Sequence, residues 1–135
     1  MRYVAFLHTD EADGFGISFP DFPGAISDGE TVDQAIQRGE EALAFHVQGM
    51  REDGLGIPVP RTVDAILADP ELAEWRAGAQ IAHVALILDR GSPKRVNVSL
   101  DPGLLEAIDA EAARRGMTRS AFLSSAARAE IKAAH

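Results

Sequence analysis

Apolar and polar positions alternate in three short runs near the start of the chain, Arg2–His8, Phe15–Phe19 and Ala25–Ser27. Alternation with a period of two is typical of strands that bury one face. The residues Asp10–Gly14 suit a five-residue hairpin loop between the first two runs, and Asp28-Gly29 predicts a turn after the third. The pattern therefore predicts an antiparallel sheet that begins with three strands.

Helical spacing follows from residue 32 to residue 52. Thr31 is a suitable N-cap, and Asp53-Gly54 supplies an end. Apolar or small residues recur every three or four positions between them, at Val32, Ala35, Ile36, Gly39, Ala42, Leu43, Val47 and Met50. This spacing predicts one helix with a single face packed on the sheet.

The next segment changes from a stiff connection to short helices and then to a strand. Gly56–Pro60 predicts an extended connection, Thr62 caps a short helix, and Pro70 opens a further turn that holds Trp75. Ile81–Leu88 predicts a fourth strand, whose dense apolar content favours a central position covered on both faces. The order β-β-β-α-(short α)-β indicates an α+β layer structure.

Strand-like alternation returns in Lys94–Leu100. One side of this predicted strand is polar and the other is apolar; the polar side holds Arg95, Asn97 and Ser99, and the apolar side holds Val96, Val98 and Leu100.

Two amphipathic helices follow the strand. Asp101 and Pro102 are favourable residues at the start of the first helix, and Gly116 is favourable just after its end. Thr118 caps the second helix, which carries an apolar face around Phe122. Residues 94–135 thus predict a strand–helix–helix module.

This module cannot close a core alone, because a single strand has no ladder partner. Two copies can pair their strands into a ribbon and enclose one core with four helices. Such a ribbon fits the major groove of DNA, where arginine reads guanine and asparagine reads adenine. We expect base contacts from Arg95, Asn97 and Ser99, and phosphate contacts from Lys94, Thr118, Arg119 and Ser120 at or near a helix start.

The charge of the chain is divided between its two parts. The formal net charge is −8, but residues 1–93 hold 6 Lys and Arg against 16 Asp and Glu, a net of −10, whereas residues 94–135 hold 7 against 5, a net of +2. Asymmetry of this kind predicts two modules with different partners. Phosphates are attracted by the basic segment, and the acidic part suits a basic partner.

Composition restricts the chemistry and the compartment. The chain has no cysteine, which excludes disulfides and thiolate metal sites. No apolar run approaches the roughly 20 residues of a membrane span, and the start of the chain lacks the pattern of a signal peptide. We expect a soluble cytoplasmic protein with no cofactor and no membrane partner.

The acidic residues Asp10, Glu11, Asp13 and Asp21 invite comparison with a metal-dependent nuclease. Such enzymes need carboxylates that converge from strand centres on two cations, whereas these residues lie in turns, where solvated charge is the ordinary explanation. The surrounding Phe19–Pro23 run predicts a rigid exposed turn, whose phenylalanines are either partly buried or meet a partner. The four histidines are scattered without ligand spacing, and we expect no enzyme.

The C-terminal part resembles the ribbon-helix-helix repressors. The similar residues are Arg95-Val96-Asn97-Val98-Ser99-Leu100, Leu105, Ile108, Ala112, Gly116, Thr118-Arg119-Ser120 and Phe122. The resemblance implies a homodimer that binds operator DNA.

The N-terminal part resembles the HicB antitoxin family. The similar residues are Gly16–Gly24, Gly29-Glu30-Thr31, Ala35, Glu41-Ala42-Leu43, Ile57-Pro58 and Pro60, whereas Thr62–Gln80 departs from the pattern. Membership of that family implies a partial RNase H-like N-terminal domain that masks a small HicA-type ribonuclease toxin. It also implies a C-terminal domain that represses the toxin–antitoxin operon in a bacterium or archaeon, associated with the nucleoid when bound to its operator.

The leading hypothesis is therefore a non-enzymatic antitoxin and repressor. Its expected organisation is a HicB-like toxin-binding domain at 1–88, a linker at 89–93 and a ribbon-helix-helix domain at 94–135. Pairing of dimers into tetramers stays open. One alternative is a stand-alone ribbon-helix-helix regulator whose N-terminal domain senses a ligand or only oligomerises. A second is an RNase H-like enzyme.

Overall fold

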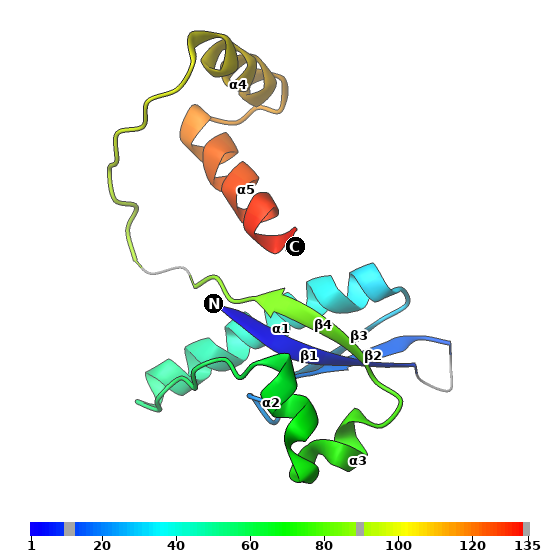
Figure 1. The fold of residues 1–135 in the computed structure, drawn as a ribbon. Helices are drawn as coiled ribbons and strands as arrows, with labels where there is room; N and C mark the ends of the chain where they lie inside the picture. The colour runs from blue at the N-terminus through cyan, green and yellow to red at the C-terminus, as the bar shows by residue number, and fades with distance from the viewer. Residues whose placement is uncertain (10–12, 89–90, 134–135) are drawn as a thin grey trace. The chain divides into compact units, whose positions relative to one another are not determined.

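The computed structural model describes residues 1–9, 13–88 and 91–133. The chain forms two compact units, Met1–Asp89 and Arg90–His135, which are described separately (Figure 1). Every helix in the described part of the chain is too short or too polar to cross a lipid bilayer.

The first unit is built on a four-stranded antiparallel sheet. Its strands are β1 (Arg2–Thr9), β2 (Phe15–Ser18), β3 (Ile26–Gly29) and β4 (Gln80–Ala85). They lie in the order β3-β2-β1-β4, so the predicted mixed α and β structure is confirmed (Figure 1).

Two details of the predicted sheet are wrong. Asp28 and Gly29 are not a turn, because they extend β3 by pairing with Gly16 and Phe15 of β2. The strand β4, which the sequence predicts to be central, lies at the edge of the sheet. It also ends earlier than Leu88, at Ala85 opposite Arg2 of β1, with a further backbone hydrogen bond of 2.8 Å from the Leu86 N–H to the Met1 carbonyl.

Strand β1 is the part of the sheet that is covered on both faces. All five residues from Tyr3 to Leu7 are buried. Tyr3, Ala5 and Leu7 belong to the core on one face, and Val4 and Phe6 belong to the core on the other. A strand that is buried on both sides shows a continuous apolar run instead of clear alternation.

Helix α1 (Val32–Glu52) covers the first face (Figure 1). Thr31 caps it as predicted, since its Oγ1 accepts a hydrogen bond from the Gln34 N–H at 3.1 Å. At the other end Gly54 adopts a positive φ of 73° and Leu55 N–H donates to the Met50 carbonyl at 2.8 Å. This Schellman arrangement satisfies the last carbonyls and places Leu55 beside the final turn.

Short helices cover the second face. They are α2 (Val63–Ala68), the 3₁₀ turn η1 (Pro70–Leu72) and α3 (Ala73–Arg76), and they supply Ile66, Leu72 and Trp75 to the core around Val4 and Phe6. Trp75 stands edge-on to Phe6 and donates its indole N–H to Ser18 Oγ at 2.8 Å. The predicted cap at Thr62 and the predicted turn that Pro70 opens are confirmed, and Asp69 is the cap of that turn.

The second unit contains α4 (Pro102–Arg114) and α5 (Arg119–Lys132), joined by a turn in which Gly116 has a φ of 68° (Figure 1). Their predicted caps, Asp101 and Thr118, are confirmed. Residues 91–101 form neither helix nor strand in the single chain. Strand formation by Lys94–Leu100 in a dimer stays a prediction.

The contact between α1 and the sheet leaves no room for a side chain at Gly39. A Cβ there would lie 2.7 Å from Cδ1 of Ile17, which is itself buried. We expect Gly39→Ala to lower the free energy of unfolding by about 1–3 kcal/mol, because the clash outweighs the gain in helix propensity. Urea unfolding followed by tryptophan fluorescence measures the change, and unchanged or increased stability would contradict this packing.

Candidate functional site

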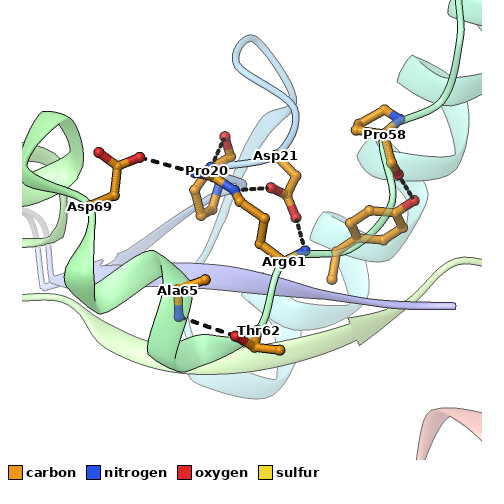
Figure 2. A network of polar contacts seen from close by, with 8 residues as sticks. Pro20, Asp21, Pro58, Arg61, Thr62, Ala65 and Asp69 are labelled. Carbon is orange, nitrogen blue, oxygen red and sulfur yellow. Dashed lines mark hydrogen bonds and ion pairs between the residues drawn. The ribbon is translucent and has the colours of Figure 1, made fainter.

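Asp21, one of the four carboxylates considered above as a nuclease cluster, is bound by Arg61. The side chain of Asp21 is only 3 % exposed. Its carboxylate accepts hydrogen bonds from Arg61 Nε at 2.6 Å and from the Arg61 backbone N–H at 3.1 Å (Figure 2). The interpretation of Asp21 as a solvated turn charge is therefore wrong.

Phe19, Pro20 and Phe22 of the run around Asp21 are also buried, contrary to the predicted exposed turn, whereas Pro23 is exposed. Phe19 and Phe22 have almost no exposed surface, and Tyr3 meets Phe22 edge-on with ring centres 4.7 Å apart. The phenylalanines thus anchor the loop in the core. This anchoring places the Asp21 carboxylate within hydrogen-bonding distance of Arg61, in the segment that leads to α2.

Arg61 extends the contacts of Asp21 to the second face of the sheet. Its guanidinium contacts Asp69 Oδ2 at 3.1 Å and the Pro20 carbonyl at 3.2 Å (Figure 2). Asp69 in turn accepts from the Glu71 N–H and begins η1. The hydrogen bond with Asp21 is the main cause that raises the pKa of Arg61.

Tyr3 of β1 contacts the same segment that carries Arg61. Its hydroxyl donates a hydrogen bond of 2.6 Å to the carbonyl of Pro58. Burial, and then the charge of Asp21, raise the pKa of Tyr3, so the hydroxyl keeps the proton that it donates. The extended segment between α1 and α2 is thus fixed to β1 as well as to the Asp21 loop.

The geometry does not support the predicted metal-dependent nuclease alternative at Asp21, since both carboxylate oxygens are used by Arg61. Asp10 and Glu11 lie outside the described residues. In residues 1–9, 13–88 and 91–133, no group of three or more His, Asp and Glu side chains is arranged to hold a metal ion.

We expect Arg61→Gln to destabilise the first unit by about 3 kcal/mol. The substitution leaves the buried Asp21 carboxylate without its counter-charge, and the cost lies at the lower end of the range for breaking a buried ion pair because Arg61 is 36 % exposed. Thermal and urea unfolding measure the loss. Arg38→Gln is the matched control, since it breaks only the exposed pair with Asp28 and should cost well under 1 kcal/mol.

The predicted DNA-reading residues are exposed in the second unit. Arg95, Asn97 and Ser99 lie in the irregular segment before α4, with Lys94 beside them, and all four side chains are accessible. Thr118, Arg119 and Ser120 lie at the start of α5 as expected. No hydrogen bond or ion pair joins any two of these seven predicted site residues within the part of the chain that the structure describes.

Arg119 has a partner that the sequence did not reveal. Its guanidinium makes two hydrogen bonds of 2.8 Å to the carboxylate of Asp109 on α4. The hydrogen bond with Arg119 is the main cause that lowers the pKa of Asp109. The two residues are ten positions apart across a turn, so no periodic pattern could have paired them. The first cation of α5 is thus partly neutralised.

Two further arginines of this unit are also paired. Arg114 and Arg115 both bind Glu111, which lowers the pKa of Glu111 to about 2. The guanidinium of Arg115 also lies 5.5 Å from the ring centre of Phe122. Lys94 and Arg95, by contrast, have no ion pair among the described residues. The unneutralised positive charge before α4 is therefore on the residues predicted to contact DNA.

The family model and the solved structure that cover most or all of the chain both point to HicB antitoxins. Residues 3–127 match the model of a family described as HicB-like antitoxins of bacterial toxin–antitoxin systems. The crystal structure of a Burkholderia pseudomallei antitoxin HicB is 38 % identical, with a TM-score of 0.57 over all of this chain and 99 % of that one.

Two other similarities cover part of the chain. A chain from a HicA3–HicB3 toxin–antitoxin complex is 28 % identical with a TM-score of 0.53, over 67 % of this chain and all of that one. Antitoxin HicB 1 of Photorhabdus laumondii is 34 % identical over 73 residues, which are 54 % of this chain. That alignment spans only about half of the relative, 47 % of its length.

Proposed function

This chain belongs to the HicB-like antitoxin family of bacterial toxin–antitoxin systems, and from that premise we propose that it neutralises a small HicA-type ribonuclease and represses its own operon. The observation that carries the proposal is the family match over both units, together with the opposite charges of the two units. In this proposal the protein is not an enzyme but a cytoplasmic binding protein with two separate surfaces.

The first unit is proposed to bind the toxin, as a partial RNase H-like domain at residues 1–88. A ribonuclease must present positive charge to RNA, and the net charge of −10 over residues 1–93 is complementary to it. A chain from a HicA3–HicB3 toxin–antitoxin complex is similar to 67 % of this chain. Binding there would exclude RNA from the toxin by covering its basic surface.

The second unit, residues 94–135, is proposed to dimerise as a ribbon-helix-helix domain. Val96 and Val98 are 71 % and 65 % exposed in the single chain, and none of the described residues of α5 is buried. Apolar surface left open in this way is covered when two copies pair their strands and share a core. The ribbon would then present Arg95, Asn97 and Ser99 twice to the operator.

The proposed function is tested by looking for a reading frame beside the gene that encodes a small basic protein and by co-expressing that protein with the full chain. We expect the two to purify as one complex, and growth inhibition by the neighbour alone to be relieved by this chain. The control is the neighbour expressed without the chain. If the neighbour inhibits growth but is neither retained nor neutralised, the antitoxin proposal is wrong. A regulator that still binds its own promoter would then be the better description.

The strand assignment predicts a specific effect of Arg95→Ala. The substitution should weaken binding to the DNA upstream of the gene by about 1–3 kcal/mol and relax the preference at one base pair of each half-site. Competition gel shifts with a panel of single-base operator changes measure both effects. Arg38→Ala removes an exposed arginine of the first unit and serves as the control. Full retention of affinity and base preference by Arg95→Ala would exclude the ribbon.

The ion pair between α4 and α5 predicts opposite effects for its two partners. Arg119→Ala should weaken binding to all DNA sequences and reduce the slope of log affinity against log salt by about 1, because one phosphate contact is lost. Asp109→Asn should strengthen binding, since it frees the guanidinium while keeping the size of the side chain. If Asp109→Asn weakened binding instead, the pair would serve to orient α5 and not to neutralise Arg119.

A further inference from the structure

A groove of about 460 Å³ lies at the C-terminal end of helix α1, between the helix and the loop 21–23. Its floor is the buried ring of Phe22 with His46 standing edge-on to it, the ring centres 6.0 Å apart. Its walls are Phe45, Met50 and Leu55. The Schellman turn after α1 holds Leu55 in this wall through the hydrogen bond to Met50.

Phe45 is unusual in this position because it is 80 % exposed in the middle of a helix. An exposed aromatic side chain contributes nothing to the core, and Ala would be the better helix former. Single exposed apolar residues are common, but this one adjoins the apolar groove. An aromatic anchor beside a pocket is the arrangement that dominates binding energy at protein interfaces.

Neither the packing nor the backbone conformation of the last turn of α1 requires a glycine at position 49. A Cβ added at Gly49 would meet nothing within 4 Å, whereas a Cβ at Gly39 would clash with Ile17. Gly49 has no positive φ either. Glycine lowers helix stability relative to alanine, so the fold alone favours a larger residue here. Gly49 lines the groove and keeps it open.

Acidic residues line the groove or lie on the helix face beside Phe45. Glu41 and Glu52 lie on the same face of α1 as Phe45, four and seven residues away, and both are exposed. Asp53, also exposed, lines the groove itself. A second copy of this chain would bring the same carboxylates together across a two-fold interface, which like-charge repulsion opposes. A basic partner with an apolar side chain fits both the apolar lining and these carboxylates.

We propose that this α1 groove is the docking site for the basic toxin, with Phe45 as its central anchor and Gly49 as the residue that leaves space for an inserted apolar side chain. The inference rests on the proposed antitoxin function and adds the surface that performs it. The neighbouring carboxylates would pair with lysine and arginine residues that the toxin otherwise offers to RNA.

The test uses calorimetry to measure the affinity of the purified full chain for the small basic protein identified by the co-expression experiment above. Phe45→Ala should weaken binding by about 30-fold or more, as for an interface hot spot. Gly49→Leu should weaken it by filling the groove. Leu67→Ala is the matched control, since Leu67 is a 42 % exposed apolar residue of α2 on the other face of the sheet, and it should change affinity less than threefold.

Thermal unfolding and sedimentation of the same variants separate docking from folding. Phe45→Ala and Gly49→Leu should unfold at or above the temperature of the parent chain, because both improve helix propensity. Parent-like affinity of both variants would overturn the groove while leaving the antitoxin function intact, and so would an equal loss in Leu67→Ala. Loss of self-association with toxin affinity unchanged would assign the groove to a second copy. Absence of binding by the parent chain would overturn the proposed function itself.

Discussion

Burial of β1 on both faces is the constraint on which the first unit depends. Because Tyr3–Leu7 are all buried, apolar cover has to be supplied on each side of the sheet. Helix α1 supplies one cover and the segment α2–α3 supplies the other, so the chain between them has to pass from one face to the other. Asp21 and Arg61 fix this passage by joining the loop after β2 to the start of α2. Burial of the apolar residues of β1 thus requires a chain crossing between the two faces, and the ion pair between Asp21 and Arg61 holds that crossing in place.

Local signals in the sequence were sufficient for most elements but not for their burial. The caps at Thr31, Thr62 and Thr118 and the glycines that end α1 and α4 gave correct helices, since these signals act within one turn. The predicted central position of β4 is wrong, because an apolar run does not reveal whether a strand has a hydrogen-bonded neighbour on both sides or on one side only. The burial of Asp21 was missed because its partner, Arg61, is 40 residues away in the sequence.

In the candidate DNA interface, too, the local elements could be predicted from the sequence and the long-range contacts could not. The start of α5 could be predicted from Thr118, but the pairing of Arg119 with Asp109 could not, because it depends on the angle at which α5 returns along α4. The pairing matters for function, since it leaves Lys94 and Arg95 as the cations of the segment that no described carboxylate neutralises. In the proposed dimer the strand partner of this segment would come from a second chain, so a pattern within one chain cannot supply it.

The hydrogen bond from Trp75 to Ser18 has a practical consequence for measurement. Trp75 is the only tryptophan of the chain and Tyr3 the only tyrosine, and both are packed in the first unit. Emission from the indole therefore reports on the cover over the second face of the sheet in the first unit. Loss of the second unit has to be followed by far-ultraviolet circular dichroism. Because α1 also contributes to that signal, unfolding of the second unit is the part of the far-ultraviolet change that the indole emission does not follow.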